Sequence, residues 1–128
     1  MNERISRYLA ELEGDKSANA FSRLREAGSD ALPSLHTALR AATSPRVKAQ
    51  IVELIWQTRE PSVVSSLAEA LNDRAPEVWK AALDGLVTIR NASSARVLQE
   101  ALAASERGTH HVPADWLREA LEQLEPLG

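Results

Sequence analysis

Two adjacent histidines are the side chains best suited to holding a metal ion. His110 and His111 are neighbours in the sequence, and Asp115 follows shortly after them. Histidine nitrogen and carboxylate oxygen are common ligands of zinc and other transition metals. Adjacent side chains on a loop rarely converge on one ion, however, and such a site would still need a third and a fourth ligand. We therefore expect solvated loop histidines, with no metal and no cofactor.

Acidic side chains recur at a constant interval along the chain and are candidates for general acid–base catalysis. Glu53 and Asp84 are separated by the same interval as Glu69 and Glu100. A carboxylate becomes a catalytic acid or base when burial or a like-charged neighbour shifts its pKa, and the hydrophobic pattern places most of these acids outside. The sequence also contains no glycine-rich phosphate loop, no Gly-x-Ser-x-Gly elbow and no histidine pair at metal-binding helical spacing. We predict no catalytic residue and no enzyme activity.

Composition and charge narrow the function classes further. The 128 residues include no cysteine, which excludes disulfides, thiolate zinc sites and cysteine nucleophiles. The formal net charge is −3, and acidic residues outnumber Arg107 and Arg118 near the C-terminus. Binding to phosphates needs clustered lysine and arginine, so we expect no nucleic-acid partner. The first twelve residues carry charges among the apolar ones, and no apolar run reaches about 18 residues, so we expect a cytoplasmic protein without a membrane segment.

The element that positions these candidate residues is repeated along the chain. Shifting the sequence by 31 positions aligns equivalent residues, a period in the range of solenoid proteins. The aligned pairs are Pro45 with Pro76, Val47 with Val78, Glu53 with Asp84, Ser62 with Ser93, Leu67 with Leu98, Ala70 with Ala101 and Leu71 with Leu102. An upstream copy joins through Ala20 with Ile51, Phe21 with Val52 and Leu24 with Ile55. The chain therefore contains at least three copies, at about 17–43, 44–74 and 75–105, in a single domain of residues 1–128.

Each copy reads as two helices. Ser44 and Pro45 form an N-cap followed by proline at the first helical position, and apolar residues then recur at helical spacing. Pro61 separates the two helices of the second copy, and the stretch 91–94 separates those of the third. Abundant alanine and leucine favour helix, while β-branched residues are scattered, so no strand is expected.

Two further helices close the ends of the array. We expect one at about 3–13 and another at about 115–125, with Asp115 as the N-cap of the latter. Terminal units of a repeat array must shield its core while presenting a polar outer face. We expect Trp116 to plug the C-terminal end of the core.

The other two tryptophans lie where they either cover the preceding repeat or stand exposed. Trp56 falls at the position that Val87 holds in the third copy, and Trp79 lies beside the core position of Val78 on the rim of its helix. Tryptophan is enriched among the residues that dominate binding energy at protein interfaces. Trp56 and Trp79 are therefore candidate exposed anchors for a partner, with packing against the preceding repeat as the alternative.

The repeat resembles the short bacterial HEAT repeat, also called the phycobilisome-lyase HEAT-like repeat. The stretch Pro-Glu-Val-Trp-Lys-Ala-Ala-Leu-Asp-Gly-Leu-Val-Thr-Ile at 76–89, followed by Ala101 and Leu102, carries the resemblance, and residues 45–73 fit the same template. The resemblance covers about 17–105 and implies an all-α fold, a right-handed α-α superhelix of three to four helical hairpins with terminal capping helices. It is specific for architecture and nearly silent on activity.

The sequence departs from this family at three places. Trp79 stands where an arginine is usual, whereas Lys48, the equivalent residue one repeat earlier, is closer to the pattern. Arg59-Glu60 and Arg90-Asn91 occupy turns where Gly-Asp is common. These departures weigh against the usual ladder of arginine–aspartate pairs between repeats and leave the expected fold unchanged.

In proteins of this family the second helices of successive repeats line a concave face, and solenoids bind partners along such faces. The alignment places a mixed set of polar and charged side chains there: His36, Arg40, Glu69, Asn72, Arg96, Gln99 and Glu100. A groove of mixed charge suits a protein or peptide better than DNA, which requires a lining of lysine and arginine.

The leading hypothesis is a non-catalytic scaffold or adaptor that binds another protein, and small proteins of this type include toxin-neutralising or regulatory partners. The resemblance leaves two alternatives. One is a bilin lyase-like or other ligand-handling protein, although three short repeats offer little volume for a tetrapyrrole. The other is a DNA-binding protein of the HEAT-type glycosylase kind, which would need a longer array and a basic aromatic groove.

Overall fold

The computed structural model describes residues 3–124, and within that range it contains helices and no strands. The α-helices are α1 (Glu3–Glu11), α2 (Ser17–Ala27), α3 (Leu32–Ala41), α4 (Pro45–Gln57), α5 (Val64–Leu71), α6 (Pro76–Ile89), α7 (Ala92–Glu106) and α8 (Ala114–Leu124). Two 3-10 helices, Gly28–Ala31 and Pro61–Val63, lead into α3 and α5. The predicted all-α fold class is confirmed.

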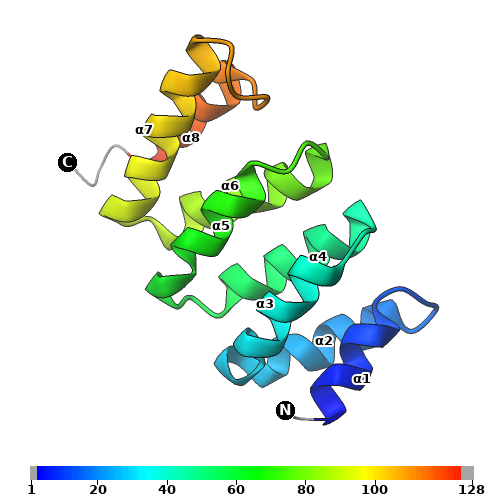
Figure 1. The fold of residues 1–128 in the computed structure, drawn as a ribbon. Coiled ribbons are helices and arrows are strands. Elements are labelled where there is room, and N and C mark those ends of the chain that lie inside the picture. The colour runs from blue at the N-terminus through cyan, green and yellow to red at the C-terminus, as the bar shows by residue number, and fades with distance from the viewer. Residues whose placement is uncertain (1–2, 125–128) are drawn as a thin grey trace.

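The helices are stacked in chain order from α1 at one end of the molecule to α8 at the other (Figure 1). Helices α3, α5 and α7 lie on the side nearer the viewer, and α4, α6 and α8 lie behind them. Successive hairpins contact one another through their first helices, α2 with α4 and α4 with α6. The second helix of one hairpin also packs on the first helix of the next, α3 on α4 and α5 on α6, and α8 packs on both α6 and α7. The molecule therefore has two long faces, a second-helix face (α3, α5 and α7) and a first-helix face (α4, α6 and α8).

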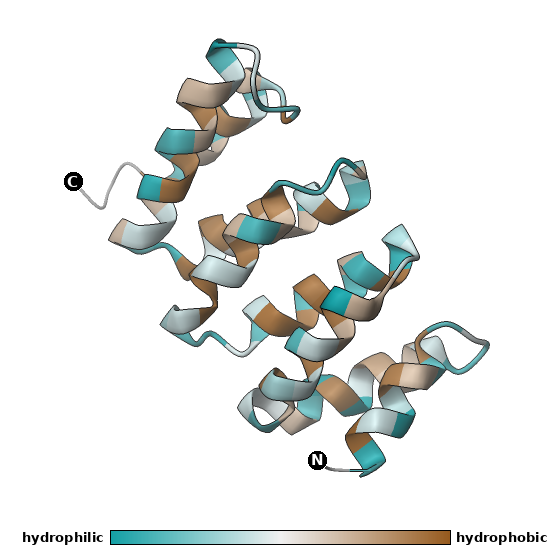
Figure 2. Ribbon diagram, in the orientation of Figure 1, coloured by the Kyte–Doolittle hydropathy of each residue, from teal (hydrophilic) through white to brown (hydrophobic). Residues whose placement is uncertain are grey.

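The core lies between these two layers, and it contains several of the apolar residues that the repeat aligns. Leu67 and its equivalent Leu98 are fully buried, as are Ile55 and its equivalent Leu86. Hydrophobic residues gather where the helices meet, and hydrophilic ones gather on the outer faces and connections (Figure 2). Because a lone hairpin exposes one of its apolar faces, stacking against the next hairpin supplies the burial that stabilises each unit.

Local capping explains where several helices begin. The Ser44 side chain accepts a hydrogen bond of 3.4 Å from the backbone N–H of Val47, which confirms the predicted N-cap of α4. The Asn91 side chain caps α7 in the same way, accepting from the N–H of Ser94 at 2.8 Å. A side-chain acceptor satisfies a backbone donor that the first helical turn leaves unpaired. Because Asn91 caps α7, that helix begins at Ala92 and the predicted break at 91–94 is shorter than expected.

Two turns adopt a left-handed backbone conformation without glycine. Arg59 has a φ of 62° and Arg90 a φ of 55°. These are the turns where the sequence departs from the Gly-Asp common in the resembling family. For residues other than glycine this conformation costs about 1–2 kcal/mol, so both turns carry backbone strain.

The C-terminal end of the core differs from the prediction. Asp115 lies inside the first turn of α8, which begins at Ala114, and its carboxylate accepts a hydrogen bond from Arg118. Trp116 is 44% exposed, and the buried face of α8 is formed by Leu117, Ala120 and Leu124. Each residue of an α-helix is rotated by about 100° from the previous one, so Trp116 falls at the edge of the stripe that Leu117 occupies. Leu117 therefore plugs the core, and the expectation for Trp116 was wrong.

Candidate functional site

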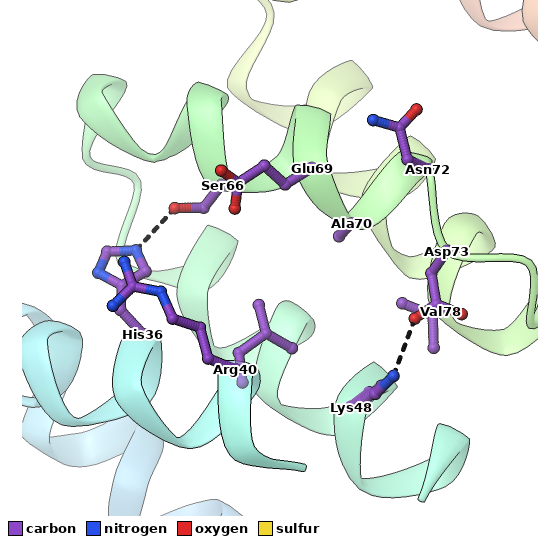
Figure 3. A pocket seen from close by; sticks show the side chains of 10 residues that line it. His36, Arg40, Lys48, Ser66, Glu69, Ala70, Asn72, Asp73 and Val78 are labelled. Atoms are coloured by element: carbon purple, nitrogen blue, oxygen red, sulfur yellow. Dashed lines mark hydrogen bonds and ion pairs between the residues drawn. The ribbon is translucent and has the colours of Figure 1, made fainter. Parts of the chain in front are cut away.

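A hollow of about 310 Å³ opens on the second-helix face between α3 and α5 (Figure 3). We call it the α3–α5 groove. It is lined by His36, Leu39, Arg40, Lys48, Ser66, Glu69, Ala70, Asn72, Asp73 and Val78. Four of the residues predicted to face a partner, His36, Arg40, Glu69 and Asn72, thus come together in one place.

A polar contact lies at each end of this groove. At one end the Ser66 hydroxyl and His36 Nε2 are hydrogen-bonded at 2.8 Å. At the other end Lys48 Nζ donates to Asp73 Oδ2 at 3.2 Å (Figure 3). The first contact joins α3 of one repeat to α5 of the next, and the second joins α4 to the turn after α5 within one repeat.

The Lys48–Asp73 ion pair lies within the second repeat and joins α4 to the turn that follows α5. Burial acts to raise the pKa of Asp73, but hydrogen bonds from the Ala75 N–H and from Lys48 outweigh that effect and leave the pKa below its ordinary value. One repeat later Trp79 replaces the cation, and its ring packs edge-on against Trp116, with centroids 5.4 Å apart. An aromatic contact with the terminal helix thus takes the place of an ion pair.

Between its two ends the groove presents a cation and an anion that have no partner among residues 3–124. Arg40 and Glu69 lie on α3 and α5, are exposed, and have no hydrogen-bond or ion-pair partner within residues 3–124. Leu39, Ala70 and Val78 supply apolar surface in the same lining. The groove therefore combines an apolar floor with an unpaired donor and an unpaired acceptor, as binding sites for polar ligands do.

A second, smaller hollow of about 210 Å³ continues the same face between α5 and α7. Its lining includes Asn72, Glu100 and His110. His110 Nε2 donates to Asn72 Oδ1 at 3.1 Å, while His110 Nδ1 accepts from the N–H of Val112 at 3.1 Å. One ring nitrogen donates and the other accepts, which defines the neutral imidazole. Burial and the neighbouring His111 lower the pKa of His110, in agreement with that neutral form.

The structure also shows which site residues the sequence missed. Arg96 and Gln99 are exposed on α7, but they line neither of the two hollows. Lys48, Ser66 and Asp73 do line the α3–α5 groove, although they were not predicted there. Lys48 belongs to a first helix and Asp73 to a turn, and only their ion pair across the hairpin brings them to the second-helix face. The family's cation–anion ladder was the one sequence signal that could have located this pair.

The two loop histidines pack instead of remaining solvated. Their rings stack with centroids 4.6 Å apart, and His111 Nε2 is buried without a hydrogen-bond partner in the described part of the chain. Asp115 pairs with Arg118 on its own helix. Among residues 3–124, no three His, Asp or Glu side chains are grouped closely enough to hold a metal ion. In the same range no helix has the length and apolarity needed to span a bilayer.

Trp56 and Trp79 were predicted to be either exposed anchors or packed against the preceding repeat, and the structure places them differently. Trp79 is 6% exposed because Trp116 and its own repeat cover it, so it cannot serve as an exposed anchor. Trp56 is half-buried, and its indole Nε1 is buried without an acceptor in the described residues. Trp56 packs against Gly85 of α6, whose missing side chain leaves room for the ring. Trp116, which was expected to be buried, is the large hydrophobic residue that stands exposed between residues 3 and 124.

Comparison with known proteins supports the architecture. Residues 32–124 match the family model described as HEAT repeats. No curated protein and no solved structure matches the chain. The matched range includes both hollows on the second-helix face and the turns that connect them.

Proposed function

Because the chain belongs to the HEAT-repeat family, we propose that it is a non-catalytic adaptor that binds a segment of another protein along its second-helix face. HEAT repeats form a scaffold suited to protein interactions, since stacking hairpins leaves an extended face free for a partner. The observation that carries the proposal is the α3–α5 groove, where Arg40 and Glu69 have no partner in the described part of the chain and lie above an apolar floor.

The chemistry of the groove favours a peptide of mixed polarity. A guanidinium donates hydrogen bonds to carboxylates and main-chain carbonyls, and a carboxylate accepts them from amides and cations. A peptide segment offers both kinds of group beside apolar side chains that can fill the space above Leu39 and Val78. Nucleic acid fits this face poorly, since Glu69 and Glu100 would repel phosphates along the same path.

The finer features of this proposal come from the resemblance to the short bacterial HEAT repeat. That resemblance covers both small regulatory or toxin-neutralising proteins and bilin-handling proteins, and we propose the former. A hollow of about 310 Å³ is at the lower limit of ligand pockets, which supports a role for the groove in holding a peptide side chain over one in enclosing a tetrapyrrole.

A pull-down with charge-reversed variants tests the proposal. We expect Glu69→Lys with Glu100→Lys to lose the protein that the wild-type chain retains from extracts of its source cells, because two exposed carboxylates on the binding path become cations. The control is Glu13→Lys with Asp15→Lys, which changes the net charge equally at exposed positions in the α1–α2 connection.

Two controls keep the result interpretable. We expect all variants to retain the far-UV circular dichroism of the wild-type chain, because the four substituted residues are exposed and lie outside the hydrophobic core. Retention of the same proteins by the Glu69→Lys, Glu100→Lys variant and by the wild-type chain would contradict the proposed site. Equal loss with the control variant would show that net charge, and not the groove, governs the capture.

A further inference from the structure

The first-helix face carries a groove of different chemistry. A hollow of about 580 Å³ lies where α4, α6 and α8 meet. We call it the first-helix groove and define it by Glu53, Trp56, Asp84, Trp116 and Glu119, which all line it. It lies on the opposite side of the hairpins from the α3–α5 groove, so a partner bound there would leave the other groove open.

The charge of this lining is uniformly negative. Three carboxylates, those of Glu53, Asp84 and Glu119, line the groove, and no lysine or arginine does. Glu53 accepts a hydrogen bond of 3.3 Å from the Gln57 amide, whereas the carboxylates of Asp84 and Glu119 have no partner within residues 3–124. Partial desolvation by its surroundings raises the pKa of Asp84. The groove therefore favours the arrival of a positive charge.

The aromatic lining supplies a second and independent attraction for a cation. Trp116 is 44% exposed, whereas the other large apolar side chains among residues 3–124 are buried or half-buried. The ammonium group of Lys80, which lies outside the groove lining, sits 5.0 Å from the centroid of the Trp116 ring. The indole face thus already attracts a cation of the chain itself, as the negative face of an aromatic ring does.

We propose that the first-helix groove is a second docking site, which binds an arginine-bearing segment of a partner protein. A guanidinium stacks flat on an indole and pairs with a carboxylate through two parallel hydrogen bonds, so one arginine side chain uses both features of the lining. An ammonium group is compact and more strongly hydrated, and it gains less from the same surroundings. An acidic peptide or a nucleic acid would be repelled by all three carboxylates.

Titration with defined peptides tests this site. The probe is the capped pentapeptide acetyl-Gly-Arg-Gly-Arg-Gly-amide, added to ¹⁵N-labelled protein up to about 10 mM, a range that covers weak peptide binding. We expect saturable shifts of the indole N–H signals of Trp56 and Trp116. The lysine counterpart binds more weakly, and the glutamine counterpart leaves these signals unchanged.

Matched variants separate the groove from general electrostatics. Glu53→Lys with Glu119→Lys weakens binding of the arginine peptide about tenfold, because two partly solvated attractions become repulsions. Glu13→Lys with Asp15→Lys raises the net charge equally and leaves the affinity within about twofold of the wild type. Absence of saturable shifts, equal shifts with the glutamine or lysine peptide, or equal weakening in both variants would overturn the proposal.

The outcome is independent of the adaptor function proposed for the other face. Glu69→Lys with Glu100→Lys changes the second-helix face only, so that variant binds the arginine peptide as the wild type does. Loss of peptide binding in that variant would place the peptide on the second-helix face and would overturn the assignment to the first-helix groove.

Discussion

At Gly85, α6 lies so close to Trp56 of α4 that a side chain would not fit without a shift. Substituting Gly85 therefore tests the packing between repeats. A Cβ atom placed on Gly85 would lie 2.7 Å from Trp56 Cδ1, 2.8 Å from its Cγ and 2.9 Å from its Cβ. The first two atoms belong to a side chain that can rotate, but the Cβ of Trp56 cannot move without its helix. Gly85→Ala must therefore separate α4 from α6 locally.

Two opposing effects set the size of the change. Alanine is favoured over glycine inside a helix by about 1 kcal/mol. Overpacking a well-filled core costs about 1–3 kcal/mol, and the fixed Cβ contact puts this site near the upper end of that range. We expect a net loss of about 2 kcal/mol in the free energy of unfolding, and a melting temperature lower by about 8 °C.

Urea unfolding followed by far-UV circular dichroism measures this change without relying on tryptophan fluorescence. Gly14→Ala, in the α1–α2 connection, is the control for adding a Cβ where space is open, since that atom would meet none closer than 4.0 Å. In a Trp56→Ala background two of the three close contacts disappear, so Gly85→Ala should cost less there than in the wild type. If Gly85→Ala stabilises the wild-type chain, as helix propensity alone would require, the packing described between α4 and α6 is wrong.

Three further predictions follow from caps, turns and titration. Asn91→Ala should lower the free energy of unfolding by about 1–2 kcal/mol in urea denaturation, because the Asn91 side chain accepts from both the N–H and the hydroxyl of the buried Ser94. Arg90→Gly should raise it by about 0.5–1 kcal/mol, because relief of the left-handed backbone exceeds the entropic cost of glycine, and an unchanged or lower melting temperature would contradict the strain. Stability should fall as the pH drops through the ordinary histidine pKa of 6.5, because burial lowers the pKa of His110 and the unfolded chain therefore takes up this proton first. Urea midpoints at pH 7.5 and 5.5 should differ less in His110→Ala than in the wild type, and an unaltered difference would contradict this role of His110.

The sequence predicted the architecture well because the repeat encodes it locally. Ser44 with Pro45, Pro61 and the apolar stripes of each copy specify where helices begin and which side they bury. Equivalent residues such as Leu67 and Leu98 are both buried because each hairpin packs against its neighbour with the same face. These features depend on residues near one another in the chain, so sequence spacing is enough to find them.

The errors concern contacts between units and at the end of the array. Whether Trp79 or Trp116 is covered depends on how α8 docks against α6, and nothing in the spacing of α8 fixes that angle. Similarly, His110 was expected to be solvated, but the loop folds back so that its ring reaches Asn72, the residue after α5. The α3–α5 groove was predicted only by its outward residues, because the ion pair of Lys48 with Asp73 forms across a hairpin.

Hydrogen–deuterium exchange of the chain, alone and with the protein that it captures, tests most directly whether the second-helix face is the binding surface. We predict slower exchange in the second half of α3 and along α5, where Arg40 and Glu69 flank the groove, with α1 unchanged. Protection confined to α1 and α2, or to the first-helix face alone, would contradict the proposed adaptor function.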